Sequence, residues 1–195
     1  KMHACGHDGH TATLLAAAQY WAEKPENRDF DGTVYLIFQP AEEGGGGAAA
    51  MMRDGLFERF PMDAVYGLHN WPGMPTGSVA ASAGPVMASS NEFKITLRGK
   101  GCHAAMPHLG HDPVVAAAAL IQGLQTIVSR NLKPIDDSVI SVPILRAGEA
   151  TNVVPNTCTL EGTVRTFTLE VLDLIEARMK AMSDAISAAY GCSAE

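Results

Sequence analysis

The chain has 195 residues, of which 47% are apolar, and a formal net charge of −7. This length and apolar content allow one or two domains with packed cores. The acidic balance argues against nucleic acid as a partner, and no apolar run reaches the roughly 18 residues that a membrane span needs. The four cysteines stand at wide, irregular spacing, which is not the pattern of a secreted disulfide scaffold. We therefore expect a cytoplasmic protein.

The first half of the chain alternates predicted helices with predicted buried strands. Residues 10–23, rich in Ala and Leu, predict a helix, and the continuous apolar run 33–38 predicts a strand buried on both faces. A glycine-rich loop, a short helix over residues 48–53 and a short strand over residues 64–68 follow. This alternation predicts an α/β domain with a mostly parallel sheet and helices on both faces. Functional groups gather at the carboxyl ends of such strands.

The pattern changes near Gly84, after which apolar residues alternate with polar ones. The alternation over residues 93–97 predicts a strand with one solvent-facing side. A helix over residues 113–129, strands over 139–145 and 157–167 and a long amphipathic helix follow. The order β-α-β-β-α predicts an α+β unit of split βαβ (ferredoxin-like) type that lacks its last strand. We therefore expect two domains, residues 1–87 and residues 88–195.

The start of the chain carries its densest group of reactive side chains, in the segment from Lys1 to His10. Chain ends usually fray, so this is an unusual place for functional chemistry. Because the second unit also stops one predicted strand short, we expect the 195 residues to be an internal piece of a longer protein.

This opening segment, His3-Ala-Cys-Gly-His-Asp-Gly-His10, contains three histidines, a thiol and a carboxylate. Thiolate and imidazole are preferred ligands of ions such as Zn²⁺. Cys5 and His7 are two residues apart, so on an extended segment both side chains would face one site. The simpler alternative is a loop with a packed cysteine and solvated histidines.

Glu42 and Glu43 stand in the glycine-rich loop after the predicted strand 33–38. One carboxylate could bind a metal ion while the other accepts a proton from a metal-bound water. Alternatively, both acids begin the next helix, where they would complement its dipole. The four glycines are not a phosphate loop, because no Gly-Lys-Ser/Thr motif follows them.

Two further histidines are candidates. His69 follows the predicted strand 64–68, although a lone histidine is more often a solvated or hydrogen-bonded polar residue. The segment from Gly99 to His108 is rich in small residues and predicts a tight bend that presents His103. A Gly-x-Ser-x-Gly elbow and a Cys-x-x-Cys motif are both absent from the sequence, which argues against a serine hydrolase and a dithiol redox protein.

Five motifs occur in one order along the chain: Met-His-Ala-Cys-Gly-His-Asp-Gly-His, Phe-Gln-Pro-Ala-Glu-Glu-Gly, Gly-Leu-His, Gly-Lys-Gly-x-His-Ala-Ala-x-Pro and Asn-Val-Val-Pro. Together they resemble the co-catalytic metallopeptidase family that contains hippurate hydrolases, N-acyl-amino-acid amidohydrolases and plant auxin-conjugate hydrolases. The resemblance runs from residue 1 to about residue 170.

The resemblance implies a centre of two divalent metal ions, with Zn or Mn expected and Co or Ni as alternatives. Cys5 resembles the ligand that bridges both ions, and a bridging thiolate should widen metal tolerance. Terminal ligands are implied at His7, Glu43 and His69, and the general base and proton shuttle at Glu42.

The second domain resembles an inserted satellite domain that forms a homodimer. Within it, His103 resembles the histidine that reaches a partner subunit's active site and polarises the scissile carbonyl. Asn152 and Arg165 resemble residues that help to hold the substrate carboxylate.

The function that the resemblance implies is metal-dependent hydrolysis of the amide bond in N-acyl amino acids such as hippurate. The family has a further histidine ligand near its C-terminus, which nothing after His111 can supply, and its catalytic domain begins upstream of Lys1. We therefore expect this piece to be inactive alone. Two alternatives stay open: a dipeptidase or carboxypeptidase of the same fold, and a non-catalytic dimerisation module.

Overall fold

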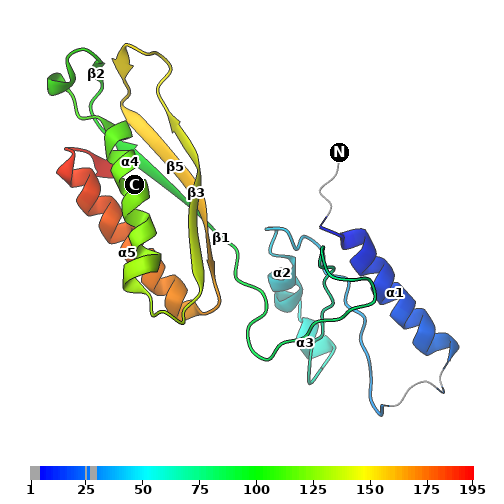
Figure 1. Cartoon of the computed structure of the whole chain (residues 1–195). Helices are drawn as coiled ribbons and strands as arrows, with labels where there is room; N and C mark the ends of the chain where they lie inside the picture. The colour runs from blue at the N-terminus through cyan, green and yellow to red at the C-terminus, as the bar shows by residue number, and fades with distance from the viewer. Residues whose placement is uncertain (1–4, 25, 27–29) are drawn as a thin grey trace. The chain divides into compact units, whose positions relative to one another are not determined.

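The computed structural model describes residues 5–24, 26 and 30–195, so His3 of the opening motif lies outside the described residues. The chain divides into two compact units, Lys1–Ala80 and Ala81–Glu195 (Figure 1). This division lies close to the predicted boundary between residues 87 and 88. No helix in the described part of the chain is long and apolar enough to cross a membrane.

The described residues of the first unit form three α-helices joined by long irregular segments: α1 (His7–Glu23), α2 (Gly47–Arg53) and α3 (Leu56–Arg59). Helix α1 begins three residues before its predicted start. Gly6 precedes it in the left-handed conformation, with φ of 103°, which glycine adopts without steric cost. The predicted short helix over residues 48–53 corresponds to α2.

The prediction of a mostly parallel sheet in the first unit is wrong for this structure. Residues 33–38 and 64–68 have no strand assignment, and no strand occurs among the described residues before Asn91. A buried strand needs neighbours that pair its N–H and C=O groups. The described part of this unit supplies none, and four apolar side chains of the run are 39–47% exposed: Val34, Tyr35, Leu36 and Phe38.

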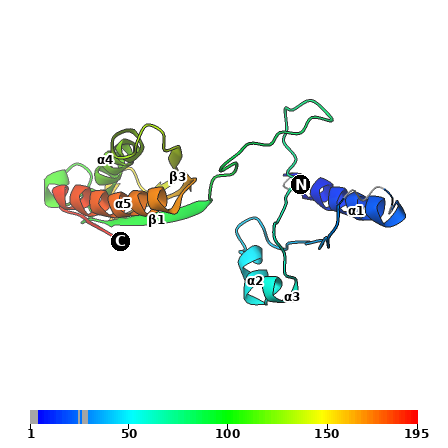
Figure 2. The same ribbon diagram turned by 90° about the horizontal axis from the view of Figure 1, so that it is seen from below.

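The second unit is an antiparallel sheet of four strands in the order β3-β5-β1-β6. Helices α4 and α5 lie side by side over one face of this sheet (Figures 1 and 2). A second, two-stranded sheet pairs β2 with β4. The elements are β1 (Asn91–Arg98), β2 (Cys102–His103), η2 (Pro107–Leu109), α4 (Pro113–Thr126), the π-helical turn η3 (Ile127–Asn131), β3 (Ser138–Ala147), β4 (Val153–Val154), β5 (Thr157–Thr166), α5 (Leu169–Ala189) and β6 (Ser193–Ala194).

The core of this unit lies between the sheet and the two helices. Alternate residues of β1 and β5 face the helices, as the period-two pattern of their sequences predicts. Asp112 caps α4 by accepting hydrogen bonds from the N–H groups of Val114 and Val115. The large, fully buried side chains of the core include Leu97, Leu120, Leu124, Ile127, Cys158, Leu160 and Ile175.

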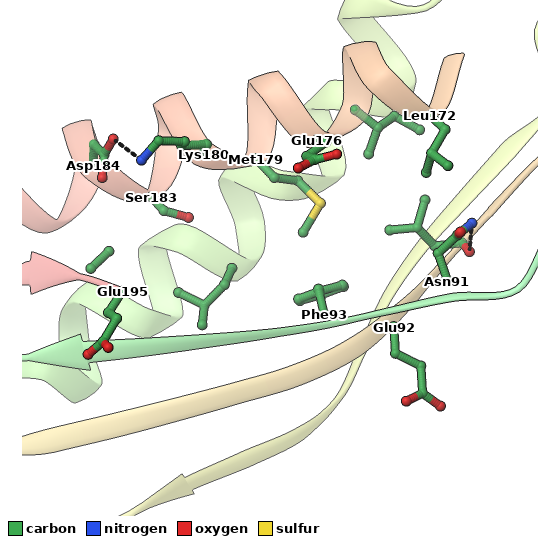
Figure 3. A pocket seen from close by; sticks show the side chains of 14 residues that line it. Asn91, Glu92, Phe93, Leu172, Glu176, Met179, Lys180, Ser183, Asp184 and Glu195 are labelled. Atoms are coloured by element: carbon green, nitrogen blue, oxygen red, sulfur yellow. Dashed lines mark hydrogen bonds and ion pairs between the residues drawn. The ribbon is translucent and has the colours of Figure 1, made fainter. Parts of the chain in front are cut away.

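The expected absence of a last strand needs correction, because β6 occupies that position. It pairs antiparallel with the end of β1, Ala194 opposite Leu97 and Ser193 opposite Arg98. Two residues are too few for a periodic pattern, so no strand was predicted here. A cavity of about 520 Å³ lies between β1 and α5, lined both by apolar side chains such as Phe93 and Met179 and by charged ones such as Glu176 and Lys180 (Figure 3).

Candidate metal centre

Cys5 and His7 flank the glycine that starts helix α1. The segment is a helix start rather than the extended chain assumed from the sequence, because Gly6 is left-handed and its carbonyl accepts the N–H of His10 at 2.9 Å. A Cβ atom on Gly6 would lie 3.0 Å from Nδ2 of Asn70. Glycine therefore allows both the turn and the close approach of Asn70.

The glycine-rich loop folds back on itself and carries two carboxylates. A Cβ atom on Gly47 would lie 1.7 Å from the carbonyl oxygen of Pro40, so only glycine fits this approach. Oε2 of Glu42 and Oε1 of Glu43 each lie 3.4 Å from Nε2 of His7. The alternative that these acids begin the next helix is wrong, because α2 starts at Gly47 and has no acid in its first turn.

The imidazole of His69 is oriented by a backbone carbonyl. Its Nδ1 lies 2.6 Å from the carbonyl oxygen of Asn70, which can only accept, so Nδ1 carries the proton and donates. In the neutral ring the lone pair is then on Nε2, which lies 3.5 Å from Sγ of Cys5. A histidine that ligates a metal typically donates its other ring N–H to a carbonyl or carboxylate in this way.

These side chains converge on one place. The ligand atoms of Cys5, His7 and Glu43 all lie within 4.8 Å of one another, and His69 joins the group through Cys5. Ligands bound to one ion at 2.0–2.3 Å are roughly 3.3–3.8 Å apart, so a small adjustment would let this set hold an ion. Thiolate, imidazole and carboxylate together suit divalent ions such as Zn²⁺. The side chains of His7 and Glu43 are about half exposed, so the centre is accessible.

His103 lies in the second unit, in the predicted bend between β1 and α4. It pairs with Val153 across the β2–β4 ladder, and its Nδ1 accepts the N–H of Ala105 at 3.1 Å. The N–H of Ala104 donates to the carbonyl of Asn152, so His103 and Asn152 stand on one rim. A cavity of about 440 Å³ is lined by these residues and by Asn156.

Arg165 is not brought to Asn152. It is an exposed residue near the far end of β5, opposite Val139 of β3. The strand rises by about 3.3 Å per residue, so the stretch from Thr157 to Arg165 is roughly 26 Å long. Within one unit, the two residues implied to share a substrate carboxylate therefore stand at opposite ends of the sheet.

Sequence reasoning missed two residues of the cluster, His10 and Asn70. The N–H of Asn70 donates to Nε2 of His10 at 2.9 Å, and the ring of His10 lies 4.5 Å from that of His69. The signal for His10 was its place in the opening motif, three residues after His7 and so on the same side of a helix. Asn70 contributes its backbone N–H and carbonyl groups, so its role could not be inferred from its residue type.

The site and the fold define a chain of two units, with a candidate metal centre of cysteine, histidine and glutamate in the first. The chain belongs to peptidase family M20/M25/M40, whose sequence profile matches residues 1–190.

Relatives of the chain include two deacetylases. It is 46% identical over 193 residues to the N-acetyl-L-cysteine deacetylase of Bacillus subtilis (strain 168), covering 99% of this chain and 45% of the relative. It is 40% identical over 195 residues to the N-acetyldiaminopimelate deacetylase of Listeria monocytogenes serotype 4b (strain CLIP80459), covering 100% of this chain and 52% of the relative. The chain thus spans about half the length of these relatives.

Solved structures agree with this assignment. The crystal structure of the Bacillus subtilis YXEP protein, described as a dinuclear metal binding peptidase from the M20 family, matches with a TM-score of 0.76 and 36% identity. That match covers 100% of this chain and 48% of the other. A protein from methicillin-resistant Staphylococcus aureus matches with a TM-score of 0.88 and 36% identity, covering 100% of this chain and 51% of the other. The chain is therefore a mixed α/β portion of an M20 fold.

Proposed function

We propose that the whole protein containing this chain is a metal-dependent amidohydrolase that cleaves the amide bond of N-acyl amino acids. The observation that carries the proposal is the convergence of Cys5, His7 and Glu43 within 4.8 Å, with His69 beside Cys5. The names of the two deacetylase relatives support an N-acetyl amino acid as substrate.

The proposed centre holds two divalent ions, Zn or Mn with Co or Ni as alternatives, between Cys5, His7, Glu43 and His69. Such ions, when bound, supply a water of lowered pKa and an electrophile for the amide carbonyl. Glu42 also lies 3.4 Å from Nε2 of His7, but it is not one of the three residues with metal-ligand spacing, and it is assigned a different role. It accepts the proton of the attacking water and returns it to the leaving amine nitrogen.

His103 is proposed to stabilise the charge that develops on the carbonyl oxygen. Because its Nδ1 accepts the N–H of Ala105, the neutral ring carries its proton on Nε2. Nε2 is therefore a donor, and a donor aimed at the developing oxyanion accelerates amide hydrolysis.

We propose a homodimer formed through the satellite unit, residues 88–195, in which His103 serves the partner subunit's active site. The edge strand β3 is one available pairing surface. Asn152 and Arg165 are proposed to bind the substrate carboxylate, and because they stand at opposite ends of the sheet, they are proposed to serve two different active sites of the dimer. In the whole protein, segments 33–38 and 64–68 are proposed to join a mostly parallel sheet with the remaining chain, in a cytoplasmic enzyme.

A second candidate function is a dipeptidase or carboxypeptidase, which the description of the YXEP protein as a peptidase favours. The deciding experiment compares turnover of N-acetylcysteine, N-acetyldiaminopimelate and hippurate with turnover of dipeptides by the whole protein loaded with Mn²⁺ or Zn²⁺. Faster turnover of the N-acyl amino acids supports the amidohydrolase. Faster turnover of dipeptides supports the peptidase, and no turnover of either class supports the non-catalytic dimerisation module.

A further inference from the structure

The imidazole of His10 lies against the candidate metal centre without belonging to its ligand set. His10 and His7 are on the same side of α1, with ring centroids 5.7 Å apart, and the ring of His69 lies 4.5 Å away. Among the described residues, only Cys5, His7 and Glu43 form a group with metal-ligand spacing. The function of the His10 ring therefore has to be sought in its hydrogen bond.

That hydrogen bond fixes what His10 can do. Its Nε2 accepts the backbone N–H of Asn70 at 2.9 Å, so the lone pair of Nε2 is used and cannot be offered to a metal ion. The acceptor is a neutral imidazole, because both ring nitrogens of a protonated histidine are donors. His10 is thus a rigid acceptor on a helix, directed at the backbone of the segment that carries His69.

The same residue, Asn70, orients His69. Its carbonyl accepts the Nδ1 proton of His69 at 2.6 Å, and its side chain packs against Gly6 between the two ligands of the helix start. His10 therefore holds Asn70, Asn70 holds the ring of His69, and Nε2 of His69 faces Sγ of Cys5 at 3.5 Å. Partners of this kind fix a ligand's tautomer and orientation.

We propose that His10 is a positioning residue, which locks the His69 imidazole as an Nε2 metal ligand by anchoring the Asn70 backbone to helix α1. The proposal rests on the proposed metal centre. It adds a hydrogen-bonded link that fixes the position of His69 relative to Cys5, a ligand 64 residues away in the sequence.

The test uses ¹⁵N NMR and Co²⁺ titration of the metal-free whole protein, roughly two pH units above the ordinary histidine pKa of about 6.5. In the unmodified chain, a scalar coupling across the N–H···N bond should join Asn70 N to His10 Nε2. His69 should show one tautomer, protonated at Nδ1. Absence of both signals in the unmodified chain overturns the proposal without any substitution.

Three variants separate the hydrogen bond from the shape of the ring. His10→Phe keeps a ring but removes the acceptor, and should mix the His69 tautomers and weaken Co²⁺ binding by about 10–100-fold. His10→Gln offers an amide oxygen in its place and should restore most of the affinity. Thr13→Val removes a different α1 hydrogen bond, from Thr13 Oγ1 to the carbonyl of Gly9, and should change neither signal.

Unchanged tautomer and affinity in His10→Phe overturn the positioning role and leave the metal centre standing. A His10→Gln chain as weak as His10→Phe also overturns it, because the acceptor would then not matter. If His10→Phe mixes the tautomers while even the unmodified chain binds no Co²⁺, the positioning of the ring is supported and the proposed metal centre fails.

Discussion

Sγ of Cys5 lies 3.5 Å from Nε2 of His69, although 64 residues separate them in the sequence. The contact joins the start of helix α1 to an irregular segment that has no regular secondary structure to position it. It brings a soft thiol and an imidazole lone pair to one point, next to His7 and Glu43.

The thiol of Cys5 should be a metal ligand. Cys5→Ser replaces sulfur with a harder oxygen, so Co²⁺ loading should lose its near-ultraviolet sulfur-to-metal absorption. The affinity should fall by more than the roughly 10–100-fold that loss of an outer-shell partner costs. Cys192→Ser, which changes a partly exposed thiol of the second unit, is the control. An absorption band that survives Cys5→Ser would exclude this thiol from the centre.

The glycine-rich loop should depend on Gly47. Gly47→Ala would place Cβ 1.7 Å from the carbonyl oxygen of Pro40, so the backbone must shift, at a cost of about 1–3 kcal/mol in the free energy of unfolding. Both tryptophans of the chain, Trp21 and Trp71, lie in the first unit, so fluorescence during urea denaturation reports on this unit alone.

The control for that loop is Gly9→Ala. A Cβ atom at Gly9 meets nothing within 4 Å, and alanine in a helix is more stable than glycine by roughly 0.5–1 kcal/mol. The two substitutions should therefore shift the unfolding midpoint in opposite directions. Equal shifts would show that the loop geometry does not constrain Gly47.

The second unit should lose stability at alkaline pH partly through Cys158. Burial, and secondly the negative charge of Asp112, raise the pKa of this thiol above its ordinary value of 9.0. The unfolded chain then releases the proton at lower pH than the folded chain. The thiol's contribution is therefore fully present below about pH 9 and is lost as the pH rises through the folded-state pKa.

The measurement is the free energy of unfolding by circular dichroism on either side of that window. Cys158→Ala should lower the free energy of unfolding at neutral pH, because it removes a buried side chain. Between neutral and alkaline pH, however, the free energy of unfolding should fall less in this variant than in the unmodified chain. An equal loss in both proteins would contradict the assignment.

Much of the second unit was predictable because its sheet pairs within itself. Alternation along β1 and β5 predicted strands that the structure contains, and the helix patterns predicted α4 and α5. The run 33–38 has an equally strong apolar pattern but no neighbour in the described residues. The apolar pattern of a segment indicates that it can be buried, but it does not show which other segments pack against it. The prediction of a strand therefore failed for residues 33–38.

The candidate site likewise has a part that could be predicted from the sequence and a part that could not. Cys5 and His7 could be paired from their spacing, and Glu43 and His69 from their positions after predicted strands, even though those strands are absent from the structure. The link from His10 to Asn70 could not be predicted, because it joins a side chain to a backbone N–H 60 residues away. Asn152 and Arg165 both belong to the segments that resemble the family, but they lie far apart, because Asn152 precedes β5 and Arg165 is near its far end.

His103 should act on the partner subunit's active site in the proposed dimer. Mixing an inactive His103→Ala protein with an inactive Glu42→Gln protein should restore activity, because each mixed dimer contains one site with both groups intact. The activity of the mixture is measured after subunit exchange has been verified by a mass-tagged chain. Exchange without recovery would show that His103 does not act in trans.

The central claim is that Glu43 binds metal while Glu42 transfers the proton, and one paired measurement tests it most directly. Metal content and N-acyl amino acid hydrolysis are determined for Glu42→Gln and Glu43→Gln in the whole protein. Glu42→Gln should keep its metal and lose the 10²–10⁴-fold in turnover typical of a missing general base, whereas Glu43→Gln should lose metal. Full metal occupancy in Glu43→Gln, or metal loss confined to Glu42→Gln, would contradict this account of the site.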